Sequence, residues 1–119
     1  MLKNLHIAGA LVLGMTSAAQ AEEHLVVLTG FAYFPGVIYA HPGDTVRFIN
    51  ESGQEQTVVG KDADWVIGPL GDNEEASIKI NAGMELLFFA AHDDDDDFGT
   101  YEQAPVRAEI TFENPPLNG

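Results

Sequence analysis

From Glu22 onward, hydrophobic and polar positions alternate along this chain in short runs. The runs are rich in Val, Ile, Phe and Thr, and Gly, Pro, Asn and Asp separate them without any sustained helical period. This pattern predicts seven strands, near His24–Thr29, Val37–Ala40, Thr45–Asn50, Gln56–Gly60, Ala76–Ile80, Glu85–Ala91 and Val106–Phe112. About seven strands in a chain of this length favour an all-β sandwich around one core.

The predicted strands differ in how much of their surface is expected to be buried. In residues 45–50 and 77–81 a polar residue follows nearly every apolar one, so one face of each strand should face the core. Residues 86–91 are apolar throughout, which is typical of a central strand covered on both sides. Pro35 cannot donate to a ladder, so its segment is predicted to be an edge or a bulge. Residues 61–73 are predicted to be loop, with or without one helical turn.

The first 21 residues have the layout of a secretory signal peptide. Lys3 precedes an apolar run at 7–15, and small residues lead into Ala19-Gln20-Ala21. A membrane anchor is the alternative, but the run is well short of the ~20 residues that span a bilayer core. We therefore expect a leader at 1–21, a domain at 22–119, a periplasmic or secreted location, and no membrane insertion after cleavage.

Charge and cysteine content narrow the function further. The chain has 19 acidic and 5 basic residues, and removing Lys3 with the leader leaves 4 − 19, a net charge of −15. This charge disfavours nucleic acid and anionic lipid and favours cations or a basic protein partner, although adaptation to a salty medium also explains it. There is no cysteine, which excludes disulfides, thiolate metal sites and thiol nucleophiles.

The segment Tyr39–Asn50, with its Pro42-Gly43-Asp44-Thr45-Val46 turn and strand, resembles the central segment of cupredoxins. The resemblance extends to Gln56-Thr57-Val58 and to the final pairing of Glu85–His92 with Val106–Phe112, and it covers nearly all of the chain after the leader. It implies a cupredoxin-like Greek-key β-sandwich.

The same resemblance implies where a type 1 copper site would lie. Copper in that family is held by a His, a later Cys, a second His and usually a Met, and the thiolate is essential for electron transfer. Here Gln56 stands at the first His, His92 matches the second, and Phe89, or Ala90 if one residue is missing, stands at the Cys. No Met follows His92. The amide oxygen of Gln56 could serve as a weak axial ligand, but it does not replace the imidazole of the first His. No type 1 copper is expected, and an electron-transfer protein with an atypical centre is the alternative.

Two other places have metal-binding chemistry. If cleavage follows Ala21, the chain starts Glu22-Glu23-His24, whose amine, two amides and imidazole form the square-planar nitrogen set that suits Cu(II) and Ni(II). Cleavage after Ala19 abolishes this motif, and His24 is then an ordinary residue at the start of an edge strand.

The second place is the acidic tract that follows His92. Its first members, Asp93 and Asp94, begin a run of five aspartates, whose carboxylates prefer hard cations, while the adjacent imidazole admits Cu²⁺ or Zn²⁺. A solvated acidic loop without cage geometry is the alternative. His41, in the Pro-Gly turn, is predicted to be a surface residue.

No phosphate-binding loop, no Ser-His-Asp arrangement with supporting context and no basic patch occurs in the sequence, so we do not expect an enzyme. The sequence therefore predicts an exported cupredoxin-like binding protein without a blue-copper site. Its ligand is predicted to be copper or another divalent cation, or a basic periplasmic protein.

Overall fold

The computed structural model describes residues 20–91 and 98–117, and within these ranges the chain forms nine strands and no helix. The strands are β1 (Glu23–Leu28), β2 (Tyr33–Phe34), β3 (Val37–Tyr39), β4 (Thr45–Asn50), β5 (Gln56–Gly60), β6 (Val66–Leu70), β7 (Glu75–Lys79), β8 (Leu87–Ala90) and β9 (Arg107–Thr111). All seven predicted strands are present, and β2 and β6 are additional, so the predicted number was too low.

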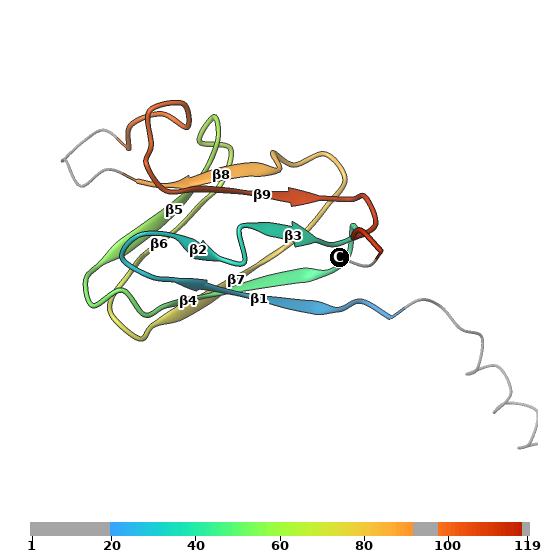
Figure 1. The fold of residues 1–119 in the computed structure, drawn as a ribbon, viewed down its shortest axis with the longest axis horizontal. Coiled ribbons are helices and arrows are strands. Elements are labelled where there is room, and N and C mark those ends of the chain that lie inside the picture. Colours follow the sequence, from blue (N-terminus) through green and yellow to red (C-terminus); the bar gives the residue numbers. More distant parts are fainter. Residues whose placement is uncertain (1–19, 92–97, 118–119) are drawn as a thin grey trace, which may run out of the picture.

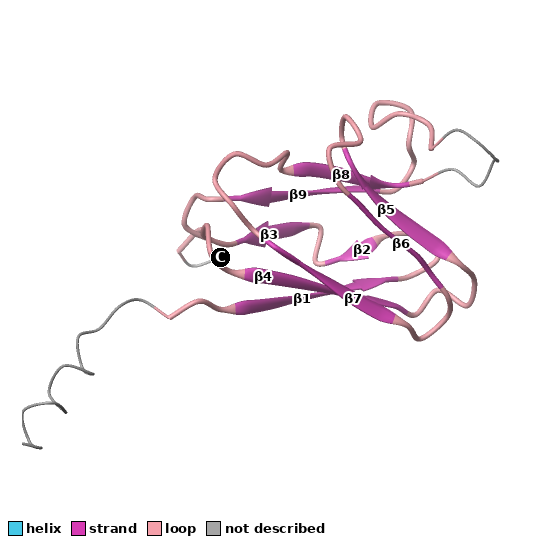
Figure 2. Cartoon of the chain, turned by 180° about the vertical axis from the view of Figure 1, so that it is seen from behind, coloured by secondary structure: helices cyan, strands magenta, loops and turns pink. Residues whose placement is uncertain are grey.

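The strands form two sheets that pack face to face (Figure 1). One sheet has the order β2-β1-β4-β7, and the other has the order β3-β9-β8-β5-β6. Two pairs are parallel, β1 with β4 and β3 with β9, and all other pairs are antiparallel. Figure 2 shows the same two layers from behind. The arrangement confirms the predicted all-β sandwich.

Strand β6 occupies the segment that the sequence pattern left as loop. It pairs with β5 through Val58↔Ile67 and Val59↔Val66, at the edge of the five-stranded sheet. Pro69 lies inside it, as an edge position allows. Strand β2 is an edge strand of the other sheet and ends directly before Pro35, as the sequence predicted.

Phe88 lies at the centre of the aromatic core between the sheets. Its ring centroid lies 5.0 Å from that of Tyr33, 5.6 Å from that of Phe48 and 5.8 Å from that of Trp65. Phe89, the next residue of β8, points to the opposite face and is also buried. Both faces of β8 are therefore covered, which confirms the central strand predicted from its apolar run.

Replacing Tyr33 with phenylalanine is expected to stabilise the fold. The Tyr33 side chain is buried in the core, and its hydroxyl finds no hydrogen-bond partner among the described residues. Burial also raises its pKa, which keeps the phenol neutral. An unpaired buried hydroxyl costs about 1–3 kcal/mol, so we expect Tyr33→Phe to raise the free energy of unfolding by about 1 kcal/mol in urea titrations. A loss of stability would mean that the hydroxyl is paired.

Candidate metal centre

Three side chains that can bind a metal meet where the first strand enters the sandwich. Strands β1 and β4 pair in parallel with Glu23 opposite Thr45 and His24 opposite Val46. This register places the residues at the start of β1 beside Asp44, which directly precedes β4. One ligand atom from each of Glu22, His24 and Asp44 lies within 4.8 Å of the other two. Of these three residues, only the His24 side chain was predicted from the sequence as a ligand, and the carboxylates of Glu22 and Asp44 were not.

Asp44 lies at the centre of this cluster, and its carboxylate accepts three hydrogen bonds. Oδ1 accepts from the backbone nitrogen of Glu22 at 3.0 Å. Oδ2 lies 2.9 Å from Nε2 of His24 and accepts from the backbone nitrogen of His41 at 3.0 Å. The side chain of Asp44 is almost fully buried. The Glu22 amide, followed by the His24 imidazole, lowers the pKa of Asp44 to about 2.

The cluster is compact enough to be considered as a cation site. Two ligand atoms on a tetrahedral Zn²⁺, each about 2.1 Å from it, lie about 3.4 Å apart. The 2.9 Å between His24 Nε2 and Asp44 Oδ2 is a hydrogen-bond distance, so the two atoms share a proton in this structure and would have to separate by about 0.5 Å to share a metal ion. The exposed Glu22 carboxylate offers a third ligand. A surface hollow of about 420 Å³, lined by Glu22, His41 and Asp44 among others, leaves room for water ligands.

Acid should remove the contribution of Asp44 to stability. Its folded-state pKa lies below the usual value of 3.8, so the ionised carboxylate stabilises the fold above about pH 4, and this is lost as pH falls towards 2. We expect Asp44→Asn to lower the free energy of unfolding by on the order of 2 kcal/mol at pH 7. In denaturant titrations, the difference in unfolding free energy between the wild-type and Asp44→Asn chains should shrink from pH 4 to pH 2. If this difference in unfolding free energy did not depend on pH, the ionised carboxylate of Asp44 would not be the source of the stability.

The amino-terminal copper and nickel motif predicted for Glu22, Glu23 and His24 needs a backbone that turns around the metal. In the structure Glu22 instead donates to Asp44, and its carbonyl accepts from the backbone nitrogen of Thr45 at 2.9 Å. Glu23 and His24 extend along β1, which lies between β2 and β4 and is not an edge strand. The motif remains a prediction, and forming it would require the first residues of β1 to leave β4. The predicted ligands His92, Asp93 and Asp94 lie outside the described residues.

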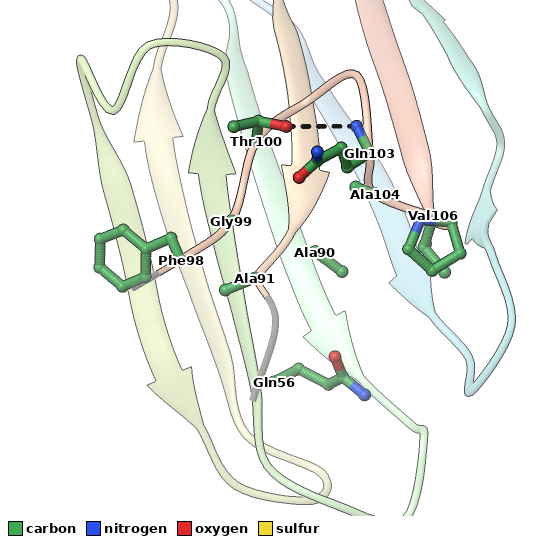
Figure 3. A pocket seen from close by; sticks show the side chains of 10 residues that line it. Gln56, Ala90, Ala91, Phe98, Gly99, Thr100, Gln103, Ala104 and Val106 are labelled. Atoms are coloured by element: carbon green, nitrogen blue, oxygen red, sulfur yellow. Dashed lines mark hydrogen bonds between the residues drawn. The ribbon is translucent and has the colours of Figure 1, made fainter. Parts of the chain in front are cut away.

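Gln56 lies far from this cluster, near the other end of β4. Asn50 ends β4, and Gln56 Nε2 donates to Oγ of Ser52 at 3.2 Å. Gln56 lines a pocket of about 240 Å³ with Ala90, Ala91, Phe98, Gly99, Thr100, Gln103, Ala104, Pro105 and Val106 (Figure 3). Apolar side chains form most of this lining.

Phe89 and Ala90 are the two residues that the cupredoxin resemblance places at the copper thiolate, and Phe89 is buried. Its ring contacts Tyr101 with centroids 6.4 Å apart. Lys61 Nζ lies 5.8 Å and Arg107 Cζ lies 5.2 Å from the centroid of the Tyr101 ring, so two cations stabilise the ring. Lys61 also pairs with Glu102 at 3.4 Å. An aromatic and cationic stack thus holds the loop after residue 97 on β8, and these side chains do not fit a type 1 copper.

Comparison with solved structures identifies the architecture. The match to an amicyanin from Paracoccus versutus covers 81% of this chain and 84% of the amicyanin chain, with 14% sequence identity and a TM-score of 0.52. The match to a pseudoazurin from Sinorhizobium covers 79% of this chain and 76% of the pseudoazurin chain, with 20% sequence identity and a TM-score of 0.51. The match to a Cu-containing nitrite reductase from Thermus scotoductus covers 85% of this chain but only 24% of the reductase chain, with 18% sequence identity and a TM-score of 0.57.

These similarities show that the chain has the cupredoxin fold, as the sequence resemblance implied. No protein-family model and no curated protein matches the chain. Because the sequence contains no cysteine, the fold is present here without a blue-copper site. In the part of the chain that the structure describes, no helix has the length and apolar character needed to cross a membrane.

Proposed function

We propose that this cupredoxin-fold chain is an exported binding protein that holds copper or another divalent cation with Glu22, His24 and Asp44. The observation that carries the proposal is the 2.9 Å pair of His24 Nε2 and Asp44 Oδ2, with a second carboxylate within reach. One imidazole and two carboxylates suit a borderline cation such as Cu²⁺ or Zn²⁺. The proposed role is binding, with no catalytic step.

Three further features support this proposal. Asp44 stays ionised over the whole physiological range, so a cation need not displace a proton from it. A net charge of −15 after loss of the leader attracts cations to the protein surface. The leader pattern at 1–21 supports export to the periplasm or out of the cell.

The test is titration with Cu²⁺ or Zn²⁺, by calorimetry and native mass spectrometry, of a chain that begins at Ala21, in which His24 is the fourth residue and the amino-terminal motif cannot form. We expect one bound ion, and His24→Ala should weaken binding at least about tenfold. Glu51→Ala is the control, because Glu51 is an exposed carboxylate that follows the far end of β4 from Asp44, and it should bind as the wild type does. Equal affinity of the wild-type and His24→Ala chains would contradict this site.

A His92→Ala variant separates this centre from the acidic tract predicted at Asp93 and Asp94. Loss of the ion in His92→Ala, but not in His24→Ala, would place the cation at the tract. A reversible one-electron couple in the copper-loaded chain would favour the alternative of an electron-transfer protein with an atypical centre.

A second candidate function is docking of a basic protein, and a row of apolar side chains on the outer face of the four-stranded sheet favours it. Val27 lies opposite Phe34 on β2 and opposite Ile49 on β4. Phe34 is 69% exposed, and the nearby Phe31 is 90% exposed. Exposed aromatic side chains on a strongly acidic protein suit a partner with apolar and basic residues. A Phe31→Ser, Phe34→Ser double variant should lose cross-links to such a partner in the exporting cell, and unchanged cross-links would contradict this role.

A further inference from the structure

We propose that cleavage of the leader after Ala21 creates an ion pair between the new α-ammonium group of Glu22 and the buried carboxylate of Asp44. Export processing would then stabilise the pairing of β1 with β4. This inference rests on the proposed cleavage point, and it does not depend on metal binding.

The acceptor for the new amino terminus is already in place. The nitrogen that cleavage would free, the backbone nitrogen of Glu22, lies 3.0 Å from Oδ1 of Asp44. The other oxygen, Oδ2, accepts hydrogen bonds from Nε2 of His24 and from the backbone nitrogen of His41, so Oδ1 is the oxygen directed at Glu22. Asp44 is 4% exposed, and an ionised group at such a position is stabilised strongly by a charged partner.

The chemistry of cleavage converts a weak contact into a strong one. Water hydrolyses the Ala21–Glu22 peptide bond, its hydroxyl goes to the carbonyl carbon of Ala21, and its hydrogen goes to the nitrogen of Glu22. The resulting amine takes up one proton at neutral pH, because an ordinary α-amine has a pKa of about 7.7–8.0. A peptide N–H offers one hydrogen and no net charge, whereas the ammonium offers three hydrogens and a full charge. Charge-assisted hydrogen bonds are roughly twice as strong as neutral ones.

The surroundings of this nitrogen allow the change. Gln20 and Ala21 are exposed and precede the first residue of β1, so their removal takes nothing from the core. They line the surface hollow beside Asp44, which provides room for the added hydrogens. The carbonyl of Glu22 accepts from Thr45, so the ion pair would lie at the first hydrogen bond between β1 and β4.

The inference depends on the cut being at one position. Cleavage after Ala19, the other site that the sequence permits, leaves Glu22 within the chain and its nitrogen as a neutral amide. A chain that begins at Ala21 is therefore a matched control, because it differs by one exposed residue and places its charge elsewhere.

The experiment compares chains that begin at Glu22 and at Ala21, each with Asp44 and with Asp44→Asn. All four are released from a fusion by a site-specific protease, checked by mass for an intact, uncyclised first residue, and unfolded in denaturant with a chelator. Neither export nor metal therefore affects the result. With Asp44, we expect the unfolding equilibrium constant of the chain beginning at Glu22 to be about tenfold smaller than that of the chain beginning at Ala21. In the Asp44→Asn pair the two constants should be equal.

Reactivity of the amino terminus gives a second readout that a purely structural role of Asp44 would not change. The Glu22 nitrogen is held 3.0 Å from the almost fully buried Asp44 carboxylate, which leaves it less accessible to a reagent, so acylation of the Glu22 amine should be slower with Asp44 than with Asp44→Asn. The amine of the chain beginning at Ala21 should react equally fast in both backgrounds. Equal stabilities of the two Asp44 chains, or equal acylation rates at Glu22 with and without Asp44, would overturn the inference.

Discussion

An Asn50→Ala chain should lose about 3–5 kcal/mol of unfolding free energy, a large part of the stability of a small domain. Asn50 is fully buried at the end of β4. Its Nδ2 donates to the carbonyls of Gln54 at 2.7 Å, Leu70 at 2.9 Å and Gly71 at 3.1 Å. Its Oδ1 accepts from the backbone nitrogen of Ser52 at 2.9 Å and from its Oγ at 2.7 Å. Alanine leaves these groups without their partner and opens a cavity, so several penalties add.

Urea titration of the wild-type and Asn50→Ala chains measures this loss directly. Asn81→Ala is a suitable control, because Asn81 is exposed in a turn where its Oδ1 accepts from the backbone of Gly83. We expect the control to lose less than about 1 kcal/mol. A loss of the same small size at Asn50 would mean that the surrounding loop reorganises and satisfies its own backbone groups.

The second large effect is expected from Gly60→Ala, which should cost about 2–3 kcal/mol. A Cβ at Gly60 would lie 2.7 Å from Nε1 and 2.9 Å from Cδ1 of Trp65, closer than atoms can pack. Trp65 cannot move away freely, because its Nε1 donates to the carbonyl of Glu85 at 3.0 Å and its ring contacts Phe88. The substitution must therefore displace the indole or break its hydrogen bond.

The chain has a single tryptophan, so fluorescence reports on this displacement without ambiguity. We expect a shifted emission spectrum together with the lower stability in Gly60→Ala. Gly83→Ala is the matched control, since a Cβ at Gly83 meets no atom within 4 Å. An unchanged spectrum and stability in Gly60→Ala would show that the core repacks around the added methyl group.

The fold was largely predictable because strong local patterns coincide with its strands. Alternation in 45–50 and the apolar run in 86–91 correspond to β4 and to the buried β8. Strand β6 was missed for a physical reason. Gly68 and Pro69 interrupt its alternation, and an edge strand tolerates them because only one side of it needs hydrogen bonds. The pairing with β5 that makes it a strand is not visible in its own residues.

The candidate metal centre was only half predictable. His24 could be selected from its position near the predicted cleavage point, but Asp44 was assigned to a Pro-Gly turn with no chemical role. Twenty residues separate the two, and the parallel register of β1 and β4 brings them together. Such a register depends on which strands become neighbours, and periodicity within one segment contains no information about it. The low pKa of Asp44 arises from the same long-range contacts.

The prolines at the sheet edges also bear on how the protein behaves when it is crowded. An open sheet edge can pair with the edge of another copy and begin an aggregate. Here β2 is two residues long and Pro35 follows it, while Pro69 lies within β6 on the other sheet. Proline offers no amide hydrogen to an incoming strand, so neither β2 nor β6 is a continuous template, and β7 and β3 are the edges that remain. Mutual repulsion between strongly acidic copies opposes pairing at all four edges.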